Sequence, residues 1–185
     1  MEEGYPFTPD TLCDLWQSIR IKAPLDPSTD LQRIRTAKNT WSSTSDVPGP
    51  DPILYTSPDG PTPTAQAQIH EYSVGLLHTL FRPTPSRRFP NPPLLAYVLR
   101  FSKIPTRRDI DTNLPIVKKD LAGNGRHRGT LIPARCIIQL CPLSPVIKGE
   151  ANRTVTPESS LSHYDSFYVN RYRTVEGHRM MRTLE

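Results

Sequence analysis

Three short apolar segments constrain the fold of this 185-residue chain more than any other feature. They are LLAYVLRF at 94–101, TLIPARCIIQLCPL at 130–143 and FYVNRY at 167–172, and basic, proline-rich connections separate them. Short apolar runs that are bounded by proline and glycine and rich in β-branched or aromatic residues are typical of strands. The chain's 21 prolines also disfavour long helices, because proline breaks a hydrogen bond in a helix interior. The sequence therefore predicts a mainly β fold, a small barrel of about five to seven short strands with irregular loops.

Alternating apolar residues and turn signals place the other strands. The predicted strands are 53–56, 65–74, 76–81, 94–101, 116–118, 130–132 and 167–172. Residues 31–36 are expected to be a short extended piece, and residues 133–143 form either a strand or a helical turn followed by a strand. The predicted loops are 83–93, 102–115 and 144–160, and the Asn-Gly pair within 120–129 predicts a hairpin connection there.

One helix is predicted near the N-terminus, in residues 11–21. Leu12, Leu15, Trp16 and Ile19 have the i, i+3, i+4, i+7 spacing that places side chains on one face of a helix. The prolines that follow forbid its continuation. We expect an N-terminal helix and extended segment at 1–40, a linker at 41–52, the β-barrel-like domain at 53–172 and a basic tail at 173–185.

The charge of the chain is divided unevenly along its length. Residues 1–60 contain five Lys/Arg and nine Asp/Glu, whereas residues 61–185 contain eighteen and nine. A density of basic residues of this kind favours nucleic acid or another acidic partner, although a solvated loop face is an equally good interpretation. The candidate nucleic-acid-binding residues lie in three successive loops expected to share one rim of the barrel: Arg87, Arg88, Lys103, Arg107, Arg108, Lys118, Lys119, Arg126 and Arg128.

The sequence contains no convincing catalytic or metal-binding motif. Asp109, Asp111 and Asn113 imitate the start of a calcium loop, but Leu114 stands near the position that requires glycine. Neither a nucleophile elbow nor a complete phosphate loop is present. We therefore expect a protein that is not an enzyme, without a cofactor or a bound metal.

The cysteines and the hydropathy pattern indicate the compartment. Cys13, Cys136 and Cys141 are too few for a disulfide framework, and the last two lie among apolar residues that predict buried thiols rather than zinc ligands. No segment approaches the roughly 20 apolar residues of a membrane span. We expect an intracellular protein in a reducing compartment, with no membrane partner.

Several aromatic residues could form a cage for a methylated lysine, although core packing is the favoured interpretation for most of them. These residues are Tyr72, Tyr97, Phe101, Tyr164 and Tyr168.

Nine short motifs follow one another along residues 11–178: LWQSIRI at 15–21, DPST at 26–29, RIRTA at 33–37, ILYTSPDG at 53–60, AQAQIHEYS at 65–73, LFRPTP at 80–85, LLAYVLRF at 94–101, IPARCIIQLCPLSP at 132–145 and TPESSLSHYDSFYVNRY at 156–172. In this order they resemble the C-terminal region of Plavaka-type transposases from basidiomycete fungi. The ending F-Y-V-N-x-Y is also similar to the end of bromo-adjacent homology (BAH) domains, which are chromatin-associated, SH3-like β-barrels.

The resemblances imply an accessory domain that lacks the catalytic carboxylates of the transposase. We expect a nuclear, non-catalytic module derived from a fungal transposase that binds DNA or chromatin. The alternative is a protein-protein interaction or structural domain that packed against a transposase catalytic domain, or a transposon remnant without function.

Overall fold

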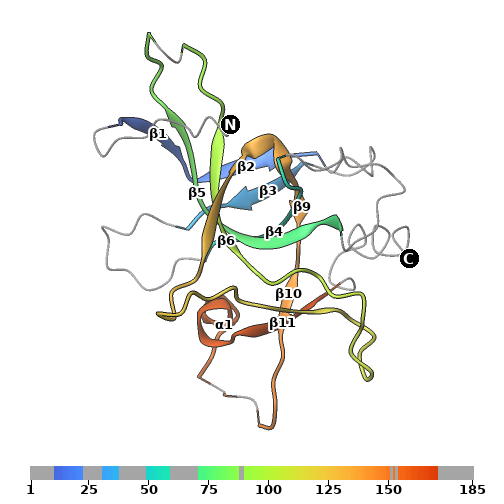
Figure 1. Ribbon diagram of the computed structural model, residues 1–185. Coiled ribbons are helices and arrows are strands. Elements are labelled where there is room, and N and C mark those ends of the chain that lie inside the picture. Colours follow the sequence, from blue (N-terminus) through green and yellow to red (C-terminus); the bar gives the residue numbers. More distant parts are fainter. Residues whose placement is uncertain are drawn as a thin grey trace.

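The computed structural model describes residues 11–22, 31–37, 49–58, 71–87, 90–150, 152 and 154–170 (Figure 1). Its elements are β1 Cys13–Trp16, β2 Ser18–Ile21, β3 Gln32–Arg35, β4 Pro52–Tyr55, β5 Ser73–Pro83, β6 Leu95–Arg100, β7 Ile116–Lys118, β8 Gly129–Pro133, the 3-10 turn η2 Ala134–Cys136, β9 Ile137–Leu140, β10 Leu143–Pro145, α1 Pro157–His163 and β11 Ser166–Val169. The predicted mainly β class is thereby confirmed. In this described part, no helix has the length and apolar character needed to cross a membrane.

The main sheet has the strand order β8-β6-β5-β4-β9, and all its neighbouring strands are antiparallel. The long strand β5 pairs with β4 near its start and with β1 near its end, along the edge opposite β6. The outer strands of the main sheet, β8 and β9, are consecutive in the chain, and only the three residues of η2 separate them. The sheet must therefore curl to bring its two edges close, although β8 and β9 do not pair with each other within the described residues.

Alternate residues of β4 face two different hydrophobic cores. Ile53 and Tyr55 pack inside the curl of the sheet, together with Leu77, Val98 and other residues of β5, β6, β8 and β9. Leu54 points to the opposite side. Such burial on both faces explains why β4 is a continuous apolar run rather than an alternating one.

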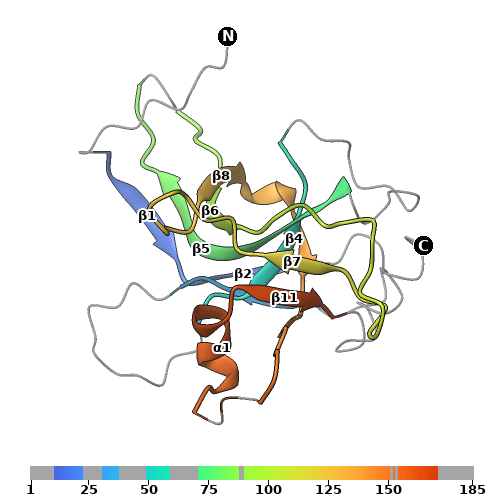
Figure 2. The same ribbon diagram turned by 60° about the horizontal axis from the view of Figure 1, so that its bottom comes forward.

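The second core lies between the main sheet and a small sheet with the order β10-β11-β7 (Figure 2). Phe167 of β11 is completely buried at its centre. The short helix α1 precedes β11, and its Leu161 packs against the same core. A capping box starts the helix, because Ser159 N donates to Thr156 Oγ1 and Thr156 N donates to Ser159 Oγ.

The third unit is the two-stranded ribbon β2–β3. Ile34 of β3 is completely buried inside the curl of the main sheet, and Ile19 and Ile21 of β2 pack against the same core. Residues before the predicted linker thus share a core with the strands after it. The domain limits themselves stay predictions.

The predicted N-terminal helix is wrong, since residues 13–16 and 18–21 form β1 and β2. Three side chains that were predicted to form the buried face of this helix are exposed, with exposed fractions of 76 % for Leu12, 56 % for Leu15 and 38 % for Trp16. Each of these segments pairs with an antiparallel strand: β1 pairs with β5, and β2 pairs with β3. Tertiary pairing therefore overrode a helical spacing that rested on four residues.

Two further differences concern chain segments predicted as loop or as separate strands. Residues 144–160, predicted as loop, contain part of β10 and most of α1. The runs 65–74 and 76–81 were predicted as separate strands, but β5 continues through Gly75 without interruption. Residues 65–70 lie outside the described part of the chain.

Most other strand predictions are confirmed. Strands β3, β4, β6, β7 and β8 coincide closely with the predicted ranges, and residues 133–143 form a helical turn followed by a strand. Strand β11 begins within a residue of the predicted closing strand, although it ends at Val169.

Candidate nucleic-acid interface

The three basic loops do not share one rim. Arg87 lies in the β5–β6 loop, Lys103 and Arg107 lie in the loop of residues 102–115, and Arg126 lies in the turn between β7 and β8. These three segments project in different directions from the main sheet, and they are separate in both views (Figures 1 and 2). Arg88 lies outside the described residues. The structure therefore does not bring these three loops together on one rim, and a nucleic-acid-binding role for their residues stays a prediction.

Some of the predicted residues are engaged in contacts within the chain. Lys119 Nζ donates to the Ser162 carbonyl at 3.0 Å and lies 3.4 Å from Asp165 Oδ1, and its side chain is only 10 % exposed. Lys119 therefore links the end of β7 to the C-terminal end of α1. Arg128 Nε lies 3.8 Å from Asp120 Oδ1, and the same carboxylate also pairs with Arg100.

The other predicted cations are more exposed. Lys103, Arg107, Lys118 and Arg126 are exposed, and Arg108 is half-buried. They remain spread over the 102–115 loop, β7 and the turn before β8.

A compact basic surface occurs instead on the β2–β3 ribbon, which we call the ribbon face. Successive side chains in a strand point to opposite sides, so the isoleucines of the ribbon face the core while its other residues face outward. The ribbon face consists of Ser18 and Arg20 of β2 and Arg33 and Arg35 of β3. In the antiparallel register, Ser18 is opposite Arg35 and Arg20 is opposite Arg33.

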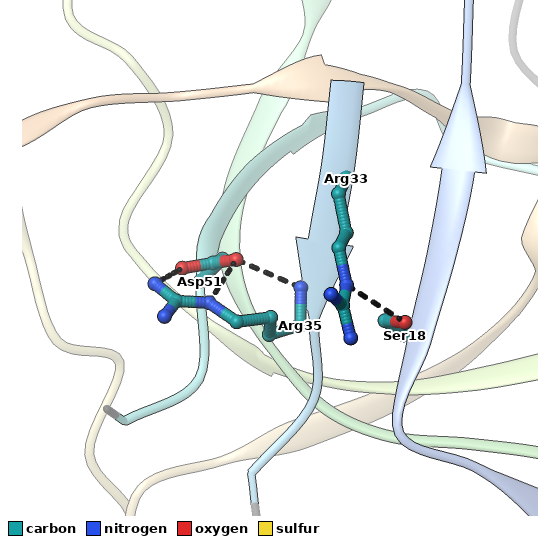
Figure 3. Close-up of polar contacts among 4 residues, drawn as sticks. All are labelled: Ser18, Arg33, Arg35 and Asp51. Carbon is teal, nitrogen blue, oxygen red and sulfur yellow. Dashed lines mark hydrogen bonds and ion pairs between the residues drawn. The ribbon is translucent and has the colours of Figure 1, made fainter. Parts of the chain in front are cut away.

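One end of the ribbon face is held in place by an ion pair (Figure 3). The guanidinium of Arg35 donates to both carboxylate oxygens of Asp51, with Nη2–Oδ1 at 2.8 Å and Nε–Oδ2 at 3.1 Å. The backbone N–H of Arg35 also donates to Asp51 Oδ2, at 2.7 Å. The side-chain hydrogen bonds with Asp51 raise the pKa of Arg35 above its ordinary value. This arginine is therefore fixed and largely neutralised.

Arg20 and Arg33, at the other end of the face, lack such compensation. Arg33 Nε donates to Ser18 Oγ at 3.3 Å, which holds the Arg33 guanidinium over β2 (Figure 3). Among the described residues, no carboxylate forms an ion pair with Arg20 or Arg33. Like charges directly opposite each other destabilise an antiparallel pair. An anion placed between the two guanidinium groups would remove this repulsion.

The sequence prediction missed this face for two reasons. Residues 1–60 carry a net negative charge, and residues 11–21 were predicted as a helix, which would have separated Arg20 from Arg33. The usable signal was the alternation of polar and apolar residues in SIRI at 18–21 and of arginine and isoleucine in QRIR at 32–35, which is typical of strands with one buried face.

Two of the three cysteines are buried thiols, as predicted, whereas Cys13 is half-buried. Cys136 and Cys141 are buried, and burial raises the pKa of Cys141 to about 12, which keeps its thiol protonated at neutral pH. Within the described ranges, no group of three or more His, Cys, Asp or Glu side chains is placed to hold a metal ion.

Three of the predicted aromatic residues, Tyr72, Phe101 and Tyr164, belong to or pack against one hydrophobic core. Tyr72 and Phe101 are buried, and the Phe101 ring packs edge-on against Phe167 with centroids 5.7 Å apart. Tyr97 on β6 contacts the ring of His78, while Tyr164 contacts His163 after α1. Core packing is thus the role of the two buried rings.

Comparison with known proteins gives no relative: no family model, no curated protein and no solved structure matches this chain. The resemblances to Plavaka-type transposases and to BAH domains therefore stay hypotheses.

Proposed function

We propose that this chain is a non-catalytic module that binds nucleic acid or chromatin, and that the ribbon face is its contact surface. The observation that carries the proposal is the directly opposed pair of Arg20 and Arg33, exposed and without an acidic partner in the described structure. Arginine presents a planar fork of donors that matches phosphate. Two arginines at directly opposite strand positions offer donors for the phosphates of one strand.

The shape of the surface supports the same conclusion. A two-stranded β-ribbon is one of the elements that the major groove of duplex DNA admits. The isoleucines behind the ribbon anchor it to the core of the main sheet, so the arginines are presented from a rigid base. Contacts between arginines and phosphates fix the position of a protein on the duplex and carry little sequence information.

The strand order of the main sheet supports a more specific fold, an SH3-like or BAH-like barrel. In SH3-like barrels, five antiparallel strands curl so that the last strand pairs with the first, and a 3-10 turn joins the fourth and fifth strands. The order β8-β6-β5-β4-β9 with η2 between β8 and β9 has this arrangement. We propose an SH3-like or BAH-like barrel, a nuclear location and an origin in the C-terminal region of a fungal transposase.

A second candidate function is a protein-protein interaction domain, for instance one that packed against a transposase catalytic domain. The observation that favours it is the exposure of Leu12, Leu15 and Trp16 in and beside β1, which lies at the edge of the main sheet. Large exposed apolar side chains are found at many contact surfaces.

The double substitution Arg20→Ala/Arg33→Ala is expected to weaken binding to duplex DNA about tenfold or more at low salt, because two phosphate contacts are lost. The slope of log K against log salt should fall by about two, since each lost contact releases one counterion fewer. Fluorescence anisotropy with a labelled 20-base-pair duplex, measured from about 50 mM salt upward, gives both quantities.

The matched control is Lys103→Ala/Arg107→Ala, which removes two exposed positive charges from a loop away from the ribbon. It should change the affinity about twofold at most. Absence of duplex binding by the unmodified chain at about 50 mM salt, where electrostatic attraction is strong, would refute the nucleic-acid proposal.

A further inference from the structure

A groove of about 600 Å³ lies beside β2, on the side of the ribbon opposite the arginines. Ile19 and Ile21 of β2 form one wall. The other wall comes from the two residues before β6, from the end of β8, from η2 and from β9. Its volume is within the range of about 300–1,000 Å³ that is usual for ligand sites. The groove is therefore large enough to hold several side chains of a partner.

The lining of the groove has a distinct chemistry. It is mainly aliphatic, with Leu94, Ala134 and Ile137 facing the isoleucines of β2. Its charged residues, Lys22 and Arg135, are both positive and both exposed. The described residues of the lining include no carboxylate and no aromatic ring. Nucleic-acid bases are usually held by stacking on aromatic rings, so this surface suits an apolar ligand with a negative charge better than a base.

The strand that forms the first wall is also an edge strand. Among the described residues, β2 pairs with β3 alone, and the groove is lined by β2 but by no residue of β3. One wall of the groove is thus formed by the strand of the ribbon that has a single strand partner. An unpaired edge offers N–H and C=O groups that an extended peptide can pair with.

We propose that this groove binds an extended, acidic peptide segment of a partner protein by adding it as a strand to β2. Alternate aliphatic side chains of the peptide lie against Ile19, Ile21 and Leu94. Its carboxylates pair with Lys22 and Arg135. The main-chain hydrogen bonds supply affinity, while the apolar wall and the two cations supply the preference for acidic, β-branched sequences.

This site does not depend on the proposed nucleic-acid interface. Arg20 and Arg33 point away from the core, whereas Ile19 and Ile21 point toward it, so the two surfaces use opposite sides of the same strand. A peptide and a duplex could therefore occupy the protein together. Substitutions at one surface should leave the other unchanged.

The test is selection of random ten-residue peptides displayed on phage against the full chain, followed by anisotropy measurements with the selected peptides labelled with fluorescein. We expect the selected peptides to combine alternating aliphatic residues with Asp or Glu. Their affinity should fall about tenfold for Lys22→Glu/Arg135→Glu, a pair of exposed positions, and recover in part when the acidic residues of the peptide are replaced by Lys. Lys103→Glu/Arg107→Glu is the matched control and should leave peptide affinity unchanged.

Three outcomes would overturn the peptide site: selected sequences without acidic residues, affinity that is indifferent to Lys22→Glu/Arg135→Glu, or an equal loss caused by the control pair. Arg20→Ala/Arg33→Ala separates the two proposals. It should abolish most duplex binding and keep peptide binding, and a loss of peptide binding in this variant would contradict the separate site.

Discussion

Phe167→Ala is expected to lower the free energy of unfolding by about 3–5 kcal/mol, the usual cost of removing a buried phenylalanine ring. Phe167 is completely buried between the main sheet and the β10-β11-β7 sheet. Its ring packs edge-on against Phe101, with an angle of 86° between the ring planes. Because domains of this size are stable by only about 5–15 kcal/mol, this one substitution should remove a large share of the total.

Chemical denaturation in urea, followed by tryptophan fluorescence and circular dichroism, measures this loss. Ile110→Ala is the control, because Ile110 is 87 % exposed and its side chain contributes little to the core. It should change stability by less than about 0.5 kcal/mol. Equal effects of the two substitutions would mean that the small sheet does not pack on the main sheet as described.

Gly75→Ala is expected to destabilise the main sheet by about 1–3 kcal/mol, since it forces an additional carbon into a packed interior. A Cβ at this position would lie 2.2 Å from Val98 Cγ1, 3.0 Å from the Leu99 carbonyl oxygen and 3.1 Å from Tyr55 Cε1. Val98 and Tyr55 belong to the core inside the curl of the sheet, and the carbonyl oxygen cannot rotate away. The neighbouring strand β6 would have to move.

Gly123→Ala provides a matched control for the same chemical change. No atom lies within 4 Å of the position that its Cβ would occupy, so stability should stay within about 0.5 kcal/mol of the unmodified chain. Thermal and urea unfolding of both variants would test the pair. A neutral Gly75→Ala would show that β5 and β6 are not in close contact at this point.

Local sequence patterns were sufficient to predict the position of a strand where the strand is a continuous apolar run. The range 94–101 predicts β6 because its side chains are buried in the sheet interior whatever the partner strands are, and turn signals bound the run on both sides. The range 116–118 coincides with β7, although only Val117 of this strand is buried. The order of the strands in the sheet was not accessible, because pairing between β4 and β9 joins residues more than 80 positions apart.

The helix prediction failed where local and tertiary preferences disagree. Four apolar residues with helical spacing occur in residues 11–21, but three of them, Leu12, Leu15 and Trp16, are exposed in the structure. Ser18 to Ile21 also alternate, and that shorter pattern is the one that the ribbon uses. A segment of this length is ambiguous until its strand partner is known.

The predicted clustering of the basic loops could not be judged from the sequence for a related reason. Counting charges along the chain emphasised loops that the fold sends in different directions, whereas the ribbon joins two arginines that are thirteen positions apart in an acidic region. Charge density along a sequence predicts a surface only when the fold brings the charged residues together.

The most direct test of the ribbon face is a titration of the isotope-labelled chain with a 20-base-pair duplex, followed by the backbone amide signals in two-dimensional NMR spectra. We predict that the largest shifts belong to the amides of β2 and β3, and that Arg20→Ala/Arg33→Ala removes them. Shifts concentrated in residues 102–115 or around Arg126, with β2 and β3 unchanged, would contradict the account.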